Sequence, residues 1–341
     1  MDSRPEKILA LQFKYLGDVV FITPALRALK EYLPDAELHV LVAAEVAPLL
    51  ENLSWINKLW SLPRTRGRAR LRDSVPLIRA LRREHFARAV DFGGNDRGAI
   101  LSFLSGATIR LGPVEKKKLL HRIGYTQTVS AAILPPSWVQ RHLQLLSAWQ
   151  VPPPASTRLE IAADPALAAA AAKLLPDGMT LCHLGTSQPR KEWPVARWRE
   201  FFRLARAAGI ALAFSTGNNE REQRLLADLK KMEPEIFALP PISDLKLFLA
   251  VLKRARRVLA GDTGPLHFAA GLGVPVIGLF GTADSLLRSA PVYAAGQIIR
   301  GGECFCDAKG SHSANCDAAR PCMAAILPEQ VLTALQKSIL I

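Results

Sequence analysis

The stretch GDTGPLHFAAGLGVPVIGLFG, residues 261–281, decides the fold class of this chain. The apolar run before it predicts a buried strand, residues 265–272 predict a short helix, and residues 276–280 predict the next buried strand. Glycine permits a tight turn at Gly264, and Pro265 suits the first turn of a helix because no backbone N–H is needed there. The stretch therefore predicts a strand–turn–helix–strand unit, the building block of a parallel sheet covered by helices.

Polar side chains gather where this helix is expected to begin: Asp262, Thr263 and His267. The free N–H groups and the positive end of the helix dipole make such a place a ready site for an anion. A turn with only a structural role needs the glycines and not these polar groups. His267 is also consistent with a buried core histidine, so two interpretations of this residue stay open.

Strand and helix patterns alternate along most of the 341 residues. The alternation runs through residues 7–149 and is then interrupted by three consecutive prolines, 152–154, which cannot extend a helix. It restarts afterwards. We therefore predict an α/β protein with an N-terminal Rossmann-like domain over residues 1–155, a second Rossmann-like domain over 156–325, and a C-terminal helix within 326–341.

The composition limits the classes of protein and partner. The net charge is +14, from 44 lysines and arginines against 30 acidic residues. Such a charge favours an anionic partner, namely a nucleic acid, a phosphorylated molecule or an acidic membrane surface. No apolar run approaches the roughly 18–20 residues that cross a bilayer, and the polar N-terminus lacks the pattern of a secretory signal. These features predict a cytoplasmic protein.

Four loops that follow predicted strands carry polar side chains. Hydroxyls, a lysine and a helix N-terminus suit a diphosphate, and a glutamate in the neighbouring loop suits the two hydroxyls of a ribose. An aspartate in the other domain is placed to act as a general base. The residues are Asp18 in the first domain and Thr186, Ser187, Lys191, Glu220, Asp262, Thr263, Gly264 and His267 in the second.

Three of these segments resemble a known family. They are KYLGDVVFITPAL at residues 14–26, KEWPVARW at 191–198 and GDTGPLHFAA at 261–270. In this order they resemble glycosyltransferase family 9, the heptosyltransferases of lipopolysaccharide core synthesis. The resemblance implies a GT-B fold, in which two doubly wound Rossmann-like domains face each other across a cleft. It also implies an inverting transfer without a metal cofactor, from an ADP-heptose donor to a lipid A–core acceptor.

The resemblance assigns roles to individual residues. Asp18 matches the catalytic base that takes the proton of the acceptor hydroxyl. Lys191 matches the diphosphate-binding lysine, which together with a helix dipole would take the place of magnesium at the leaving group. Glu220 matches the ribose-binding acid. The full donor-binding set that the resemblance implies is Thr186, Ser187, Lys191, Glu220, Asp262, Thr263, Gly264 and His267.

Two basic runs lie in the half that would bind the acceptor. One interpretation is a solvated surface with salt pairs. The other is contact with acceptor phosphates and with the anionic cytoplasmic face of the inner membrane. Nucleic-acid binding is disfavoured because aromatic residues do not alternate with these charges. The residues proposed for the acceptor are Arg64, Arg66, Arg68, Lys116 and Lys117.

Four of the five cysteines lie close together near the C-terminus: Cys304, Cys306, Cys316 and Cys322. In a cytoplasmic protein, such clustering favours metal binding over disulfides, and His312 is a further potential ligand. The spacing is not the usual pair of a zinc finger. A structural zinc ion and a set of reduced thiols that pack a loop therefore both remain open.

A second class of function is a nucleotide-sugar-binding scaffold of envelope assembly that has no transfer activity. The presence of both Asp18 and Lys191 favours the enzyme, because the loss of either residue would favour the scaffold. The sugar and the acceptor themselves do not follow from the fold and the donor loop.

Overall fold

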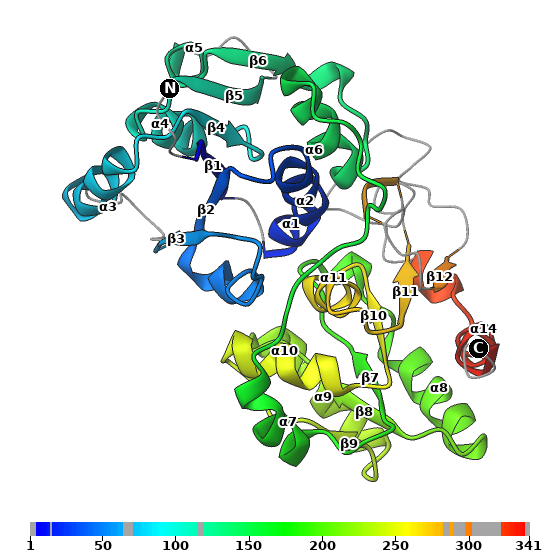
Figure 1. Ribbon diagram of the computed structural model, residues 1–341. Coiled ribbons are helices and arrows are strands. Elements are labelled where there is room, and N and C mark those ends of the chain that lie inside the picture. The colour runs from blue at the N-terminus through cyan, green and yellow to red at the C-terminus, as the bar shows by residue number, and fades with distance from the viewer. Residues whose placement is uncertain are drawn as a thin grey trace. The chain divides into compact units, whose positions relative to one another are not determined.

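A computed structural model of the chain describes residues 5–13, 16–63, 71–114, 119–281, 287–289, 297–301 and 322–337 (Figure 1). The chain divides into two compact units, Met1–Ala162 and Ala163–Ile341. The sequence places this division earlier, after residue 155. Glu160 ties the intervening segment to unit 1, since its carboxylate pairs with Arg27 at 2.5 Å and its N–H donates to Thr23 Oγ1 at 3.0 Å.

Unit 1 contains a six-stranded sheet with the order β3-β2-β1-β4-β5-β6, and all of its strand pairs are parallel. This is the strand order of a Rossmann fold. The order reverses between β1 and β4, and ligands of such sheets bind at the carboxyl ends of the strands beside this reversal. The strands are β1 (Lys7–Gln12), β2 (Glu37–Ala43), β3 (Lys58–Leu62), β4 (Arg88–Asp91), β5 (Ile109–Val114) and β6 (Gln127–Ser130).

The helices of unit 1 are α1 (Leu16–Phe21), α2 (Thr23–Tyr32), α3 (Leu71–Arg83), α4 (Asp96–Leu104), α5 (Leu119–Gly124) and α6 (Trp138–Leu146), with 3₁₀ turns η1 (Ala44–Leu49), η2 (Ala131–Ile133) and η3 (Ser147–Trp149). Leu9 and Leu11 of β1 pack in one buried cluster with Leu81 of α3 and Leu101 of α4. Successive side chains of a strand point to opposite faces, so Gln12 lies on the other face. Helices α1, α2 and α6 group together, as Figure 1 shows.

Unit 2 repeats this plan, with the sheet order β12-β11-β10-β7-β8-β9 and parallel pairing throughout. The reversal now lies between β7 and β10. The expectation of two doubly wound Rossmann-like domains is therefore confirmed. The strands are β7 (Thr180–His183), β8 (Leu212–Ser215), β9 (Phe237–Ala238), β10 (Arg257–Gly261), β11 (Val276–Phe280) and β12 (Gln297–Arg300).

The helices of unit 2 are α7 (Ala168–Leu174), α8 (Val195–Ala207), α9 (Glu220–Met232), α10 (Leu245–Arg254), α11 (Gly264–Gly271) and α14 (Pro328–Lys337), with 3₁₀ turns η4 (Pro165–Leu167), η5 (Pro189–Lys191) and η7 (Cys322–Ala325). The C-terminal helix α14 belongs to the core of unit 2, because Val331 and Leu335 are buried in one cluster with Trp198. None of the helices in the described ranges has the length and apolar character needed to cross a membrane.

Candidate active site

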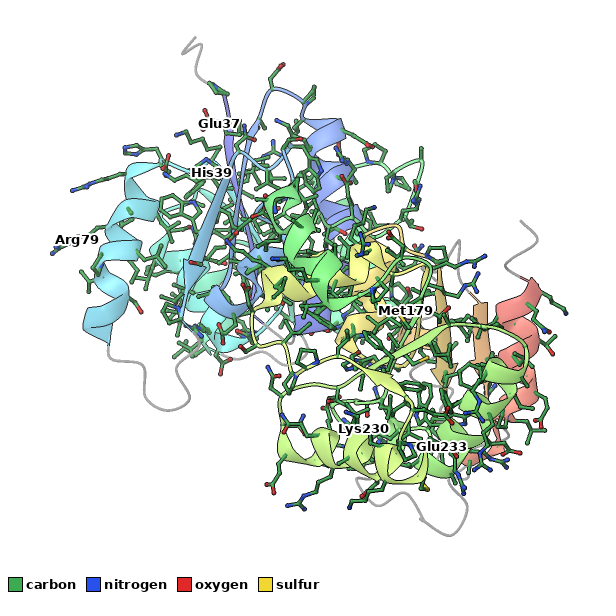
Figure 2. The ribbon with its side chains drawn as sticks, turned by 90° about the horizontal axis from the view of Figure 1, so that it is seen from below. Glu37, His39, Arg79, Met179, Lys230 and Glu233 are labelled. Atoms are coloured by element: carbon green, nitrogen blue, oxygen red, sulfur yellow. The ribbon has the colours of Figure 1, made fainter. Side chains whose placement is uncertain are left out.

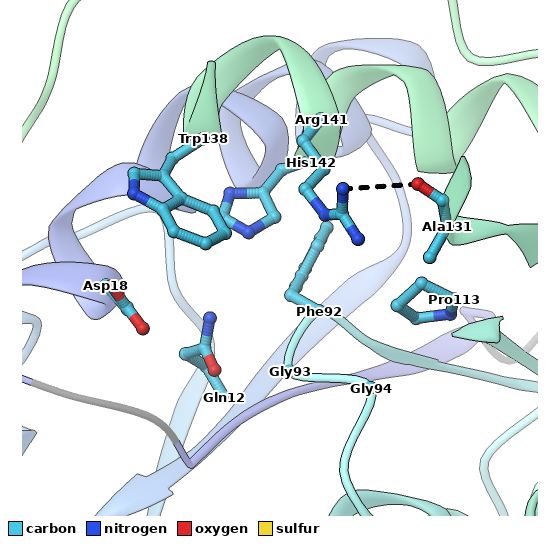
Figure 3. Close-up of a pocket in the computed structure, with 10 residues that line it drawn as sticks. All are labelled: Gln12, Asp18, Phe92, Gly93, Gly94, Pro113, Ala131, Trp138, Arg141 and His142. Carbon is cyan, nitrogen blue, oxygen red and sulfur yellow. Dashed lines mark hydrogen bonds between the residues drawn. The ribbon is translucent and has the colours of Figure 1, made fainter. Parts of the chain in front are cut away.

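Asp18 borders a small cavity in unit 1 (Figure 3). It lies on α1, the short helix that follows β1, and the cavity has a volume of about 100 Å³. Gln12, the last residue of β1, lines the cavity beside Asp18. Helix α6 supplies Trp138, Arg141 and His142 above them in the view of Figure 3. The cavity thus lies at the reversal of the strand order, where the fold predicts a ligand.

Two contacts of α6 fix the positions of residues that line this cavity. The ring of buried His142 lies with Nδ1 3.2 Å from the carbonyl oxygen of Phe21, so α6 is linked to the end of the helix that carries Asp18. Arg141 Nη1 donates to the carbonyl oxygen of Ala131 at 3.4 Å. A carboxylate, a guanidinium and an amide therefore border one cavity, a set that suits a ligand with hydroxyl and anionic groups.

The turn Gly93–Gly94, which lines the same cavity, is fixed by a buried carboxylate. Asp91 is fully buried at the end of β4, and its Oδ1 accepts from the Gly93 N–H at 2.9 Å. The Tyr125 hydroxyl donates to the other oxygen, Oδ2, at 2.5 Å. Burial and the negative charge of Asp91 raise the pKa of Tyr125 far above its ordinary value, so its hydroxyl stays protonated as the donor. Gly94 has φ +60°, which favours glycine.

In unit 2, Lys191, Asp262 and His267 form a charged cluster at the reversal of the strand order. Lys191 Nζ lies 2.5 Å from Asp262 Oδ2, and His267 Nε2 lies 3.4 Å from Asp262 Oδ1. Burial alone would raise the pKa of the Asp262 carboxyl. The hydrogen bonds and charges of His267 and Lys191 outweigh burial and hold that pKa well below its ordinary value. Asp262 is therefore ionised, and the buried His267 lies beside its carboxylate.

The start of α11 lies beside this cluster. Thr263 is the N-cap residue, with extended backbone angles, and its side chain forms no capping hydrogen bond within the described part of the chain. Gly264 is the first helical residue and is followed by Pro265, which lacks an N–H. A helix dipole and a hydroxyl at one helix start are suited to an anionic ligand.

The loop after β7 approaches the loop after β10. Thr186 is buried and its hydroxyl donates to the Gln188 carbonyl at 2.6 Å, whereas Ser187 is exposed. An added Cβ at Gly261 would lie 3.0 Å from the Lys191 carbonyl oxygen and 3.1 Å from Thr186 Cγ2. Glycine at this position therefore allows the close approach that brings Lys191 to Asp262.

The acid buried at the neighbouring strand end is Glu222, whereas the sequence-based expectation names Glu220, two positions earlier. Glu220 is the first residue of α9, its side chain is 80% exposed, and it pairs with Arg224 one turn later. Glu222 is buried and accepts from the Gly217 N–H at 2.8 Å and from the Asn219 side chain. The two side chains differ because residues two positions apart on a helix point about 200° away from each other.

Glu222 reaches the carboxyl ends of β7 and β8 at once, because its carboxylate fills the space that a Cβ at Gly185 would need. A signal for it exists in the sequence: Asn219 followed three residues later by glutamate is a capping pattern. The Asn219 side chain accepts from the Glu222 N–H at 3.0 Å, as this pattern requires. The cavity residues Gln12 and Arg141 carried no comparable signal.

Arg221 joins the elements of this site. Its Nη1 donates to Glu192, its Nη2 donates to the Thr186 carbonyl at 2.5 Å, and Nη2 also lies 3.7 Å from Glu222 Oε1. Burial raises the pKa of the Glu192 carboxyl, and Arg221 opposes that shift. One guanidinium thus links the loop that carries Thr186 to the helix that carries Glu222.

Several predicted residues lie outside the described part of the chain: Arg64, Arg66, Arg68, Lys116, Lys117, Cys304, Cys306, Cys316 and His312. Cys322 is described and is buried in the core of unit 2. The described residues contain no group of three or more His, Cys, Asp or Glu side chains that could hold a metal ion. The zinc prediction therefore gains no support from them.

The sequence matches the family model of glycosyltransferase family 9 (heptosyltransferase) over residues 75–310, more than half of the chain. The chain belongs to glycosyltransferase family 9. It is therefore a glycosyltransferase, as the motifs predict. Its sequence is 22% identical to lipopolysaccharide heptosyltransferase 3 of Escherichia coli, over 80% of this chain and 83% of that protein.

Solved structures of this family share the fold. A glycosyltransferase of family 9 from Veillonella parvula has a TM-score of 0.81 and 17% identity, over 100% of this chain and 99% of that chain. The E. coli heptosyltransferase WaaC, solved with ADP-2-deoxy-2-fluoro heptose, has a TM-score of 0.71 and 19% identity over 97% and 99%. With two six-stranded parallel sheets, this family 9 member has the expected GT-B fold.

Proposed function

We propose that this enzyme transfers a heptose from ADP-heptose to a lipid A–core oligosaccharide during lipopolysaccharide synthesis, with inversion and without a metal cofactor. The E. coli relative is named a lipopolysaccharide heptosyltransferase, and WaaC was solved with an ADP-sugar. The observation that carries the proposal is the cluster of Lys191, Asp262 and His267 at the start of α11. Its cation, its hydroxyl neighbours and its helix dipole are suited to a diphosphate.

The donor would be held by both loops at the reversal of the sheet in unit 2. Lys191 and the α11 N-terminus, with Thr263 and Gly264, would bind the diphosphate, supported by the hydroxyls of Thr186 and Ser187. Glu222 takes the role that the sequence assigns to Glu220. A carboxylate can accept about four hydrogen bonds, so contacts to Gly217 and Asn219 leave capacity for a ribose diol.

The departing diphosphate gains negative charge as its bond to the anomeric carbon breaks. Fixed positive groups at that position supply stabilisation that grows toward the transition state. Lys191 and the dipole of α11 would provide it here, which is the role that magnesium has in other transferases. Asp262 keeps Lys191 at this position in the absence of donor, since the ion pair spans 2.5 Å.

Asp18 would act as the general base. The acceptor hydroxyl attacks the anomeric carbon from the face opposite to the diphosphate, a new glycosidic bond forms, ADP leaves, and the hydroxyl proton passes to the Asp18 carboxylate. The cavity beside Asp18 offers Arg141 and Gln12 as further contacts for a hydroxyl-rich, phosphorylated acceptor. The proposal includes a glycolipid acceptor at the cytoplasmic face of the inner membrane and gives no role to nucleic acid.

The substitution Asp18→Asn tests the proposal. It should abolish transfer from ADP-heptose to a defined core acceptor and leave ADP affinity, measured by calorimetry, within about twofold, since one missing base affects chemistry and not donor binding. The control is Asp228→Asn on the exposed face of α9. Transfer by Asp18→Asn within threefold of wild type would overturn the assignment of the base. ADP binding by a wild-type protein that transfers no sugar would favour the scaffold.

A further inference from the structure

Large apolar side chains are exposed together on α4 and α5 of unit 1. Of the twelve large apolar residues that are exposed in the described part of the chain, five lie on these two helices. The most exposed are Leu119 at 69%, Phe103 at 48% and Ile123 at 47%. The α4–α5 face, as we name it, consists of Ile100, Phe103, Leu119, Leu120 and Ile123.

This face is not needed to bury the two helices. Helix α4 already packs on the sheet through Ala99 and Leu101, which are buried. The helices also meet each other closely, because an added Cβ at Gly124 would lie 2.7 Å from the Ala99 carbonyl oxygen. The two helices are therefore packed without these side chains, and large apolar side chains left exposed on adjacent helices indicate an interaction site.

Arginines border the α4–α5 face. Arg79, Arg82 and Arg83 are exposed on α3, and Arg122 is exposed on α5. Figure 2 shows Arg79 projecting from α3 away from the sheet. Within the described residues, none of these four forms an ion pair with a carboxylate. Asp96 is the one acid of α4, and α5 has none, so the four arginines outnumber the acids of these two helices.

Two arginines lie close to the apolar part of this face. An added Cβ at Gly106, in the turn after α4, would lie 3.8 Å from Arg82 Cγ, and the Gly106 N–H donates to the Phe103 carbonyl at 3.2 Å. Arg110 Cζ lies 5.7 Å from the centre of the Phe103 ring, and Arg110 Nε donates to the Gly124 carbonyl at 2.8 Å. These contacts place Arg82 beside the turn after α4, and Arg110 beside Phe103 and the end of α5.

We propose that the α4–α5 face, with the arginines of α3 and α5, docks this enzyme on a bilayer that contains anionic lipids. The apolar side chains enter the boundary between headgroups and acyl chains, and the guanidinium groups contact lipid phosphates. A second copy of the chain is a poorer occupant, because the net charge of +14 and the arginine border would repel it. The proposal rests on the proposed function, since a glycolipid acceptor is presented at such a surface.

The experiment measures binding to vesicles by flotation, with vesicles of phosphatidylethanolamine and 30% phosphatidylglycerol and with neutral phosphatidylcholine vesicles. The charge variant is Arg79→Gln/Arg82→Gln/Arg83→Gln, and the apolar variant is Leu119→Ser/Ile123→Ser. The matched controls carry Arg206→Gln/Arg224→Gln/Lys231→Gln and Met232→Ser/Phe237→Ser, which are exposed positions of unit 2. Circular dichroism confirms that each variant is folded.

Wild type and controls should bind the anionic vesicles and release at high salt. Each arginine near an anionic surface raises the partition of the protein from water onto the vesicle by about fivefold. The charge variant lacks three arginines and should therefore bind on the order of 100-fold more weakly. The apolar variant should lose at least about tenfold. Folded variants that bind the anionic vesicles as strongly as wild type would overturn the proposal. Wild-type protein that does not bind the anionic vesicles would overturn it as well. A concentration-dependent dimer that only the apolar variant abolishes, without an effect on vesicle binding, would assign the face to a second copy instead.

A second measurement separates this proposal from the proposed function. Both variants should transfer heptose to a soluble, delipidated core acceptor as fast as wild type, because none of the changed residues lies at the donor site or the Asp18 cavity. Vesicle binding by a wild type without transferase activity would retain the docking surface and reject the proposed function. Transfer to the soluble acceptor by a wild type that binds no vesicles would retain the proposed function and reject the docking surface.

Discussion

Lys191 Nζ and Asp262 Oδ2 lie 2.5 Å apart, although 71 positions separate the two residues in the sequence. The contact connects the loop after β7 to the start of α11, on either side of the reversal in strand order. His267 completes the cluster from the first turns of α11. A cation, a carboxylate and an imidazole thus meet at one helix N-terminus, which is the arrangement that we propose as the donor site.

The substitution Lys191→Ala should weaken ADP binding by about 10- to 100-fold, the range for a lost hydrogen bond between charged groups. The single-turnover rate with bound ADP-heptose should fall as well, because the diphosphate carries more charge in the transition state than in the ground state. Calorimetry and rapid-quench kinetics measure the two effects. Lys230→Ala, on the exposed face of α9, is the control and should change neither. Unchanged ADP affinity in Lys191→Ala would remove Lys191 from the donor site.

Glu222→Gln should reduce ADP affinity, whereas Glu220→Gln should not, because only Glu222 faces the strand ends. A structural role alone would also lower affinity, so the decisive measurement compares ADP with 2′-deoxy-ADP. Wild type should prefer ADP by about tenfold or more, and Glu222→Gln should lose most of that preference. An equal preference in Glu222→Gln and wild type would mean that the carboxylate does not contact the 2′-hydroxyl.

Tyr125→Phe should lower the free energy of unfolding by about 1.5–3 kcal/mol, the contribution of a hydrogen bond to a charged group. The reason is the buried Asp91 carboxylate, which then keeps the Gly93 N–H but loses the hydroxyl donor at 2.5 Å. Denaturant unfolding measures the change, and Tyr32→Phe at an exposed position is the control. The acceptor KM should rise too, because the turn that lines the Asp18 cavity loses a support. A loss no larger than that of the control would show that Asp91 does not depend on Tyr125.

Stability should fall as the pH decreases from 7 to 5, in part through His183. Burial lowers the pKa of this histidine to about 4, from an ordinary value of 6.5. Between these two values the unfolded chain binds the proton more strongly than the folded chain, so stability is full above pH 6.5 and is lost as the pH falls toward 4. This group alone should account for about 2 kcal/mol between pH 7 and pH 5.

The measurement is denaturant unfolding of wild type and of His183→Asn at both pH values. The free energy of unfolding of His183→Asn should change by about 2 kcal/mol less between pH 7 and pH 5 than that of wild type, because asparagine does not titrate in this range. His85→Asn, at an exposed position, is the control and should keep the wild-type slope. An equal slope in His183→Asn and wild type would show that His183 is not held neutral by burial.

Part of this structure could be predicted because it depends on local patterns. Continuous apolar runs become buried parallel strands, and the polar residues that follow them must meet at one sheet edge. Asp18, Lys191, Asp262 and His267 were found in this way, and each lies at such an edge in the structure. The helix start at Gly264 and Pro265 was predicted from the same kind of local pattern, and α11 begins there.

Other features depend on which side of an element faces its neighbours. Glu220 and Glu222 both fit a helix start, and only the packing of α9 against the sheet turns Glu222 inward and leaves Glu220 in water. The end of unit 1 likewise extends past the prolines because Glu160 binds Arg27, a contact between residues 133 positions apart.

The sequence by itself thus determined the two α/β units, the family and the polar residues at the strand ends. These features follow from hydrophobic periodicity and short motifs, which extend over only a few neighbouring residues. The tertiary structure decided which acid is buried beside the proposed donor site, the cavity around Asp18 and the exposed α4–α5 face. Each of these depends on long-range packing, which selects the side chains that are enclosed and those that remain on the surface.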